Sequence, residues 1–312
     1  MFRYILKRLL YMIPVLLGMS LIIFTIMDMT PGDPARTILG ANADKEAVDE
    51  LRREMGLDDP FFVRYGRYVS SALRGEFGNS WRTNVPVVSE LMARVPVTLF
   101  LGVGAAILMV LFALPIGVVS AVRQYSFIDN VSMLAAIILT SVPGFVLGLV
   151  LMLQFSLRLR WLPATGADTL LHFILPWIAA ATPLTASLIR TTRSNMLEVI
   201  RQDYIRTAKA KGASDMAVIV GHALKNALLP IITIIGVNFG LLMGGALITE
   251  TVFAIPGIGT LLVTSVRNKD TPLVMGNVLF LCAIISFINL IVDVSYAYID
   301  PRIKSQYVRR LD

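Results

Sequence analysis

The chain has 312 residues, of which 56% are hydrophobic and 16% are charged. An ordinary soluble domain carries about 25% charged residues, so this composition excludes a mainly soluble enzyme, a disordered tail and a coiled coil. The net charge of +7 would suit nucleic acid, but the basic residues are best explained by membrane topology, and we expect no nucleic-acid partner. Cys282 is the single cysteine, so no internal disulfide can form. With two histidines, no metal site is expected.

The apolar residues gather in six windows, each long enough to cross a hydrocarbon core of about 30 Å as a helix. Backbone in lipid must satisfy its own hydrogen bonds, which predicts a helix in each window. Buried helices of a soluble globule would explain one or two such windows but not six. The first window has a basic start but no small-residue cleavage site, so we predict a retained anchor. The windows are 9–29, 97–121, 131–157, 170–189, 228–253 and 275–298.

The distribution of lysine and arginine predicts the orientation of these spans. With a cytoplasmic N-terminus, basic residues are frequent on the inner side and few in the two short outer loops. The long outer segment 30–96 is acidic as well as basic, and it is long enough to cross the membrane largely regardless of charge. An even number of spans returns the basic C-terminus to the cytoplasm. The inner segments are then 1–8, 122–130, 190–227 and 299–312.

The outer segment 30–96 reads as a small helical insert. Asp44 can cap its first helix and Gly56 can end it. Pro60 and Pro86 can each open a further helix. Two roles fit this insert equally: a cap over the outer mouth of the bundle, or a docking surface for a soluble partner. The predicted helices cover 44–55, 60–74 and 86–93.

The inner segment between the fourth and fifth spans carries a short predicted helix. Asp203 can cap a helix from Tyr204 to Lys211, and Gly212 suits the left-handed residue that ends it. Asp215 can cap the next helix, which we expect to run to about residue 227. The pattern therefore predicts two short helices joined at Gly212 and held between two spans.

The short helix has two distinct faces. Arg206 and Lys209 are three residues apart and share one face, whereas Tyr204, Ile205 and Ala208 form a compact apolar face. A rigid helix held at both ends can transmit a push. The alternative is an amphipathic loop that binds lipid headgroups.

Small residues recur along the fifth span. Gly236, Gly240 and Gly244 are spaced by four and line one helix face, which allows two helices in lipid to pack closely. The neighbour is either another helix of this chain, a partner subunit or the moving wall of a pathway. Pro143 predicts a kink in the third span, and Pro176 with Pro183 predict one in the fourth.

Three charged residues lie inside the windows, at Asp28, Glu250 and Asp293. Asn289 and Asp293 share a stripe of the last span. A carboxylate in the bilayer usually faces protein or water. Asp293 and Asn289 are therefore either part of a polar network at an inner gate or a structural hydrogen bond near the interface. Glu250, near the outer end of its span, is an interfacial or gating candidate.

The segment between the fourth and fifth spans matches a known sequence pattern. The stretch 203–212, continuing to Leu229-Pro230, resembles the EAA loop of ABC importer permeases, in which Glu-Ala-Ala is followed by three residues, a Gly and a spaced Leu-Pro. The Gly falls on Gly212. Arg206 and Thr207 replace the leading Glu and Ala, and this version resembles the dipeptide/oligopeptide/nickel branch. Further stretches that resemble the same branch are 31–34, 250–253 with 256–259, and 289–293 with 300–302.

The resemblance covers essentially the whole chain and implies a fold. It implies an all-α integral membrane protein with six transmembrane helices, the type I ABC importer permease fold. The first span would occupy 1–29, the extracytoplasmic insert 30–96 and the five-span core 97–312. Within the core, 190–227 would be the coupling loop.

The resemblance also implies partners. These are a second, similar permease, two ATPases, an extracytoplasmic solute-binding protein and the lipid of a bacterial inner membrane. ATP and Mg²⁺ would bind the ATPases, because this chain contains no Gly-Lys dipeptide and hence no Walker A loop. We therefore expect a non-catalytic subunit without a cofactor of its own. The residues implied to contact an ATPase are Asp203, Tyr204, Ile205, Arg206, Thr207, Ala208, Lys209, Ala210, Lys211 and Gly212.

The solute is the least specified part of this interpretation. The resemblance implies import of di- or oligopeptides or similar small solutes, and the alternatives within the family are glutathione and nickel or a metallophore. A stand-alone secondary transporter is a more distant alternative. Such proteins often show inverted repeats or ionisable residues at mid-membrane, and neither is evident in this sequence.

Overall fold

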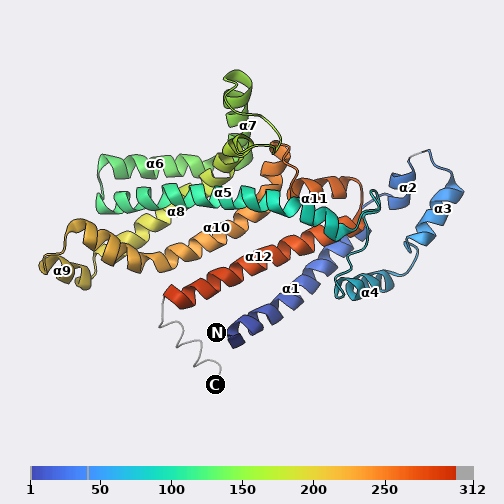
Figure 1. Cartoon of the computed structure of the whole chain (residues 1–312), viewed down its shortest axis with the longest axis horizontal. Helices are drawn as coiled ribbons and strands as arrows, with labels where there is room; N and C mark the ends of the chain where they lie inside the picture. Colours follow the sequence, from blue (N-terminus) through green and yellow to red (C-terminus); the bar gives the residue numbers. More distant parts are fainter. Residues whose placement is uncertain (1, 41, 300–312) are drawn as a thin grey trace. The chain divides into compact units, whose positions relative to one another are not determined.

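The computed structural model describes residues 2–40 and 42–299, and this part of the chain is helical apart from one isolated bridge between Asn79 and Pro86. Figure 1 follows the helices along the chain. They are α1 (Phe2–Met29), α2 (Pro34–Leu39), α3 (Lys45–Glu54), α4 (Phe61–Ala72), α5 (Val87–Val122), α6 (Phe127–Ser141), α7 (Gly144–Leu151), the π-helical η1 (Met152–Arg158), α8 (Leu171–Ile200), α9 (Asp203–Ala210), the π-helical η2 (Ala217–Leu224), α10 (Lys225–Val252), α11 (Ile258–Arg267) and α12 (Thr271–Ile299).

The chain forms two compact units. Unit 1 comprises Met1–Thr98 and Pro256–Ser286, and unit 2 comprises Leu99–Ile255 and Phe287–Asp312. Unit 1 therefore contains the predicted insert, and unit 2 contains the predicted coupling segment.

In unit 1, α4 packs against the C-terminal half of α1. The ring of Phe24 lies edge-on to that of Phe61 with centroids 5.3 Å apart. The hydroxyls of Ser20 and Tyr65 are 2.9 Å apart, within hydrogen-bond distance. An aromatic pair of this geometry contributes about 0.5–1.5 kcal/mol beyond the area it buries. The insert is thus anchored to the first span by packing and by a polar contact.

A buried carboxylate ties the loop before α5 to the start of α12. Asp270 is 3% exposed and accepts hydrogen bonds from the Ser80 hydroxyl at 2.5 Å and from the Trp81 backbone N–H at 3.2 Å. It also accepts from the backbone N–H of Leu273 at 3.3 Å, in the first turn of α12. One side chain therefore both caps a helix and fixes a loop of unit 1.

In unit 2, α8 packs against α6, α7 and α10 (Figure 1). The core contains fully buried apolar side chains from three of the long helices, including Met109, Leu188, Met196 and Ile231. α8 continues through Pro176 and Pro183 as one helix. It is the element against which α6, α7 and α10 all pack.

Five described helices are long and apolar enough to cross a membrane, and a bent pair makes a sixth if it is counted as one span. The bent pair corrects the prediction of a single helix over 131–157, because α6 and the following α7–η1 segment meet at 96°. The break falls at Val142, which is extended with ψ 119°, and Pro143. Proline lacks an N–H and disfavours helical backbone in the residue before it, so α6 cannot continue.

The insert matches the predicted helices only in part. α3 and α4 lie where expected, and Gly56 is left-handed with φ +64° after α3. The third predicted helix, 86–93, is instead the first turns of the long α5. The short helices α2 and α11 were not predicted from the sequence, although Asp33 caps α2 by accepting from the Ala35 N–H at 3.0 Å.

Candidate functional site

The predicted coupling segment contains a single short helix, α9, with a defined end. Gly212 is left-handed, with φ +85°. Its N–H donates to the carbonyl of Lys209 at 3.0 Å, and the N–H of Ala213 donates to that of Ala208 at 3.3 Å. These two bonds form a Schellman motif, which satisfies carbonyls that the last helical turn leaves free. The prediction that Gly212 ends this helix is confirmed.

The start of α9 differs from the prediction. The N-cap residue is Gln202, and Asp203 is already inside the helix. The Asp203 side chain is 97% exposed and lies 3.8 Å from Arg206. An acidic residue in the first turn is favourable toward the helix dipole, so Asp203 stabilises α9 electrostatically rather than as a cap.

The apolar face of α9 is divided between the protein interior and the surface. Ile205 is 2% exposed and belongs to the core of unit 2, and Ala208 packs against that core. Tyr204 is 45% exposed. The predicted apolar face is therefore only partly buried. Ile205 and Ala208 hold α9 against the protein, and Tyr204 is left at the surface.

The basic side chains of α9 have acidic neighbours. Lys209 lies 3.2 Å from Asp215, and these side chains are 56% and 83% exposed. Exposed pairs of this kind contribute about 0–1 kcal/mol. The charges consequently give α9 a polar, exposed surface on which acidic and basic side chains lie side by side.

The segment after Gly212 also differs from the prediction. Ser214, not Asp215, caps the following helix, accepting from the Ala217 N–H at 3.3 Å. That helix does not end near residue 227, because η2 runs directly into α10. Likewise α8 extends to Ile200, so α9 lies between two long helices with only short connections. Pro230 lies inside α10.

A buried ion pair near this segment was not predicted from the sequence. Asp129, at the start of α6, accepts from the Arg193 Nε at 2.6 Å and from its Nη2 at 2.8 Å. The Asp129 side chain is 2% exposed and that of Arg193 is 21% exposed. The Arg201 guanidinium adds a hydrogen bond of 3.4 Å to Gln124 in the loop before α6. α8 and α6 are therefore joined by polar contacts as well as by apolar packing.

The glycines of the fifth span have different surroundings. A Cβ at Gly236 would lie 2.5 Å from a methyl of Val292 in α12, so this position requires glycine for close packing. Gly240 is half-buried. Gly244 is exposed, and a Cβ there would meet no atom within 4 Å among the described residues. Packing within the subunit therefore explains Gly236 but not Gly244.

The predicted polar network of the last span lies partly outside the described residues. Glu250 is fully buried in the last turns of α10, and Asn289 is exposed on α12. The side chain of Asp293 lies outside the described residues, as do residues 300–302. A gate formed by these groups stays a prediction.

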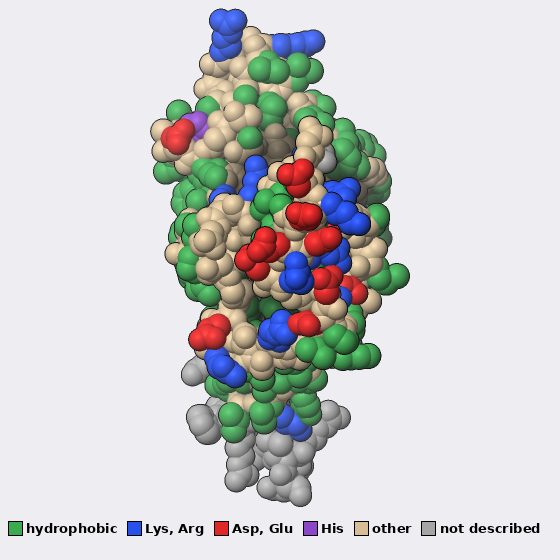
Figure 2. Space-filling view, turned by 90° about the vertical axis from the view of Figure 1, so that its right-hand side faces the viewer, with side chains coloured by type: hydrophobic (Ala, Val, Ile, Leu, Met, Phe, Trp, Pro, Cys, Tyr) green, Lys and Arg blue, Asp and Glu red, His purple; other side chains and the backbone are tan. Residues whose placement is uncertain are grey.

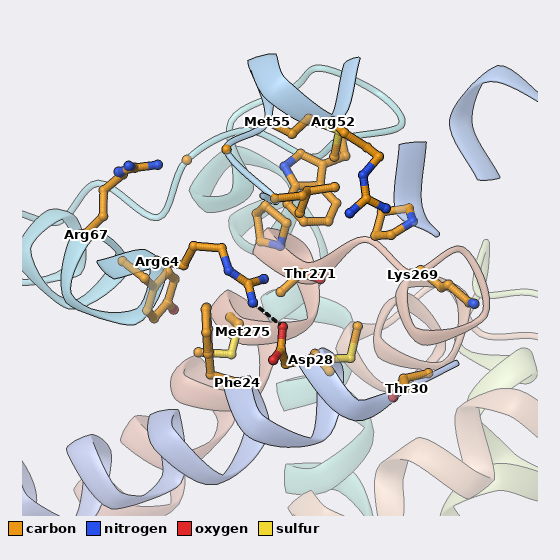
Figure 3. A pocket seen from close by; sticks show the side chains of 18 of the residues that line it. Phe24, Asp28, Thr30, Arg52, Met55, Arg64, Arg67, Lys269, Thr271 and Met275 are labelled. Atoms are coloured by element: carbon orange, nitrogen blue, oxygen red, sulfur yellow. Dashed lines mark hydrogen bonds and ion pairs between the residues drawn. The ribbon is translucent and has the colours of Figure 1, made fainter. Parts of the chain in front are cut away.

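Unit 1 carries a pocket of about 570 Å³ between the insert, the end of α1 and the start of α12 (Figure 3). Aromatic and methionine side chains line part of it, and they include Phe24, Tyr68, Trp81, Met27 and Met55. Acidic and basic side chains are interleaved over the surface of the insert helices (Figure 2). The pocket thus combines an adaptable apolar lining with charged groups.

The arginines that line this pocket form ion pairs with carboxylates of the insert or of the first span. Arg52 contacts Asp33 at 3.0 Å and Asp58 at 2.9 Å. The hydrogen bond to Asp58, and to a smaller extent the one to Asp33, raises the pKa of the Arg52 guanidinium. Arg64 lies 2.5 Å from Asp28, as drawn in Figure 3. Asp28, which ends the first span, is therefore part of the attachment of the insert.

Tyr68 differs from the paired arginines of the pocket. Its hydroxyl is buried and has no hydrogen-bond partner among the described residues. Burial raises the pKa of this phenol well above its usual range, with a smaller contribution from Tyr65. The phenol is therefore neutral under all physiological conditions, and its unpaired hydroxyl is a cost to folding.

Comparisons with known proteins agree with this arrangement. A family model described as "Binding-protein-dependent transport system inner membrane component" matches residues 113–305, and the model of the N-terminal part of such components matches residues 1–102. The chain is 40% identical over 304 residues to the glutathione transport system permease protein GsiC of Escherichia coli (strain K12), covering 97% of this chain and 99% of that protein. It is also 40% identical over 332 residues to the dipeptide transport system permease protein DppB of Alkalihalophilus pseudofirmus, covering 97% and 100%.

The fold has solved counterparts. An inward-facing structure of the MetNI methionine ABC transporter superposes with a TM-score of 0.54 at 19% identity, covering 68% of this chain and 97% of that one. The predicted type I permease fold is therefore confirmed. In this family, ATP hydrolysis takes place on separate subunits. The chain belongs to the family of inner-membrane components of binding-protein-dependent transport systems, as the non-catalytic, multi-pass permease subunit of an ABC importer.

Proposed function

We propose that α9 is the coupling helix of this permease, the element that contacts an ATPase subunit and passes its motion to the spans. The observation that carries the proposal is the combination of a fixed base and a free outer face. Ile205 anchors α9 in the core and Gly212 ends it in a Schellman motif, whereas Tyr204 and the side chain of Arg206 are exposed. α8 and α10 leave it on either side, so a displacement of α9 reaches both.

The assembly that we infer contains this chain, a second homologous permease, two ATPases and an extracytoplasmic binding protein. ATP and Mg²⁺ bind only the ATPases in this scheme. Both termini and α9 face the cytoplasm, in agreement with the basic inner segments. The open surface at Gly244 suits contact with the second permease.

The insert is the element that we assign to the outer side. Its ion pairs keep the short helices in place, and its surface carries isolated exposed apolar residues such as Phe62 and Leu73, which are 81% and 77% exposed. A rigid, charged surface with a few exposed apolar side chains suits reversible docking of a soluble binding protein. The same element would cap the outer mouth of the bundle.

Small peptides are the solute class that we propose, because two relatives of 40% identity are named for glutathione and for dipeptide transport. Glutathione is itself a tripeptide, so both names describe one chemical class. A nickel or metallophore importer of the same family is the alternative.

The test is uptake by the complete transporter. The chain, its partner permease, ATPases and binding protein are reconstituted in vesicles, and uptake of labelled dialanine, glutathione and Ni²⁺ is measured with and without ATP. Uptake of either peptide that requires ATP and every partner supports the proposal. Concentrative uptake by this chain alone, or uptake restricted to Ni²⁺, would refute it.

A further inference from the structure

The carboxylate of Asp129 accepts three hydrogen bonds in the first turn of α6. Arg193 of α8 donates two parallel hydrogen bonds, one to each carboxylate oxygen, at 2.6 and 2.8 Å. The backbone N–H of Tyr125 donates a third at 2.9 Å, and Tyr125 itself is held at φ +63°. Ser126 accepts from the Asp129 N–H at 3.3 Å and caps α6. The first turn of α6 is thus built around this ion pair.

Burial alone does not explain the pair. Removing a carboxylate from water is costly, and replacing a buried ion pair with apolar side chains is often neutral or stabilising. α6 and α8 already pack extensively along their length. What a bidentate arginine–carboxylate pair adds is geometry, because two parallel hydrogen bonds fix both the distance and the relative orientation of the partners. Apolar packing alone resists sliding of one helix along the other less strongly than such a pair does.

The position of the pair relates it to coupling. Arg193 lies in the last turns of α8, the part of the helix that leads to α9. Arg201, at the end of α8, makes the second contact to the same loop through Gln124 at 3.4 Å. A displacement of α9 that travels along α8 must pass through this stretch, while η2 and α10 provide the connection on the other side of α9.

We propose that Asp129 and Arg193 form a positioning latch that makes α6 move together with α8 when α9 is displaced. The proposal rests on the assignment of α9 as the coupling helix. In this mechanism the ion pair prevents α6 from sliding along α8, so that the motion of one helix becomes the motion of two. Asp129 and Arg193 contact neither solute nor nucleotide in this scheme, and they act through the helices that carry them.

The latch can be tested by the distance between the two helices. Spin labels are placed on cysteines at Leu134 in α6 and Ser194 in α8, both exposed, in a Cys282→Ser background. The distance is measured in the assembled transporter, nucleotide-free and after trapping with ATP and vanadate, and this readout requires no solute. With the native pair we expect the same distance in both states. With Asp129→Asn or Arg193→Lys we expect trapping to shift it by roughly 1–5 Å, the range of helix shifts and slips of up to one turn.

Two controls separate a latch from a merely structural contact. Arg123→Gln removes an exposed cation from the same loop, one with no described side-chain contact, and should leave the distance constant. The double variant Asp129→Leu with Arg193→Met replaces the pair by apolar packing. We expect it to recover the melting temperature lost in the single variants but to show the same shift on trapping.

Three outcomes would overturn the latch. The first is a distance between the two labels that already changes on trapping in the native transporter. The second is a distance that stays constant on trapping in the single variants, and the third is one that stays constant in the double variant. Failure of the coupling-helix assignment gives a different result, because Gly212 variants would then leave ATP hydrolysis and uptake coupled. Uncoupling by Gly212→Val together with a constant distance in the latch variants would refute the latch alone.

Discussion

Replacing Gly212 by valine tests the end of α9 without altering its surroundings. Gly212 is left-handed at φ +85°, and a Cβ there would meet nothing within 4 Å of the described residues. The substitution therefore acts through backbone strain, not through a clash. A left-handed conformation costs a residue with a Cβ about 1–2 kcal/mol, which shifts the equilibrium constant between the native and the opened helix end about 5- to 30-fold toward the opened end.

The expected result is partial uncoupling. If the Schellman end of α9 opens, its attachment to the following helix becomes flexible, and the displacement produced by the ATPases is lost before it reaches the spans. We expect Gly212→Val to raise the ATP hydrolysed per dialanine or glutathione molecule imported, by at most about 30-fold, which is the upper limit that the strain sets. The assay measures phosphate release and uptake together in vesicles that hold equal amounts of assembled transporter.

Two further variants make the result interpretable. Gly212→Asn should be close to wild type, because asparagine adopts left-handed backbone at low cost. Gly75→Val introduces the same strain in the insert, since Gly75 has φ +82° and equally open surroundings, and should leave the ratio of hydrolysis to uptake unchanged. If Gly212→Val also imports with the native ratio, α9 does not carry the motion and the reasoning is wrong.

The structure gives three other expected outcomes. Tyr68→Phe should raise the free energy of unfolding by about 1–3 kcal/mol by removing an unpaired buried hydroxyl. Because the pKa of Tyr68 is raised in the folded state, this residue makes the native protein lose stability as pH rises above about 10, where the unfolded chain ionises. Thermal unfolding at pH 8 and pH 11 should therefore show a larger loss of stability in the native protein than in the variant, and equal losses would contradict the burial of this phenol. Gly236→Ile forces a side chain into Val292 at an overpacking cost of about 1–3 kcal/mol, which should lower the melting temperature of the purified subunit. Gly244→Ile should leave the melting temperature unchanged and should reduce recovery of the permease pair on size-exclusion chromatography. Equal effects of both variants would contradict the packing assignment. Asp270→Asn should cost about 1–3 kcal/mol through its hydrogen bonds, and protease cleavage near residue 80 should become faster; native cleavage rates would argue against the role of this carboxylate.

The features that local chemistry dictates could be predicted from the sequence. Long apolar windows become spans because lipid leaves backbone groups no other partner. Gly56 and Gly212 mark helix ends because glycine adopts the left-handed conformation without strain. The break near Pro143 was predicted as a kink, but its 96° angle depends on packing that no local pattern encodes.

The parts of the site that were missed depend on contacts between distant residues. Asp129 and Arg193 are far apart in sequence, and each alone reads as an ordinary charged residue near a membrane interface. Ile205 and Tyr204 are neighbours in one short helix, yet one is buried and the other exposed. Asp203 and Asp215 look like caps, but Gln202 and Ser214 occupy those positions, because a cap is decided by where the chain enters the helix.

The arrangement of unit 2 fits the proposed coupling role of the short helix α9. α8 is continuous from Leu171 to Ile200 and contacts α6, α7 and α10. Gly144 brings α7 close to it, since a Cβ there would lie 3.1 Å from the Ala179 carbonyl oxygen. The break at Pro143 divides the third span, so α6 and α7 can follow different parts of α8. Interiors packed at this density respond by shifting between discrete arrangements rather than deforming continuously. A displacement delivered by α9 at one end of α8 can therefore reposition several helices together.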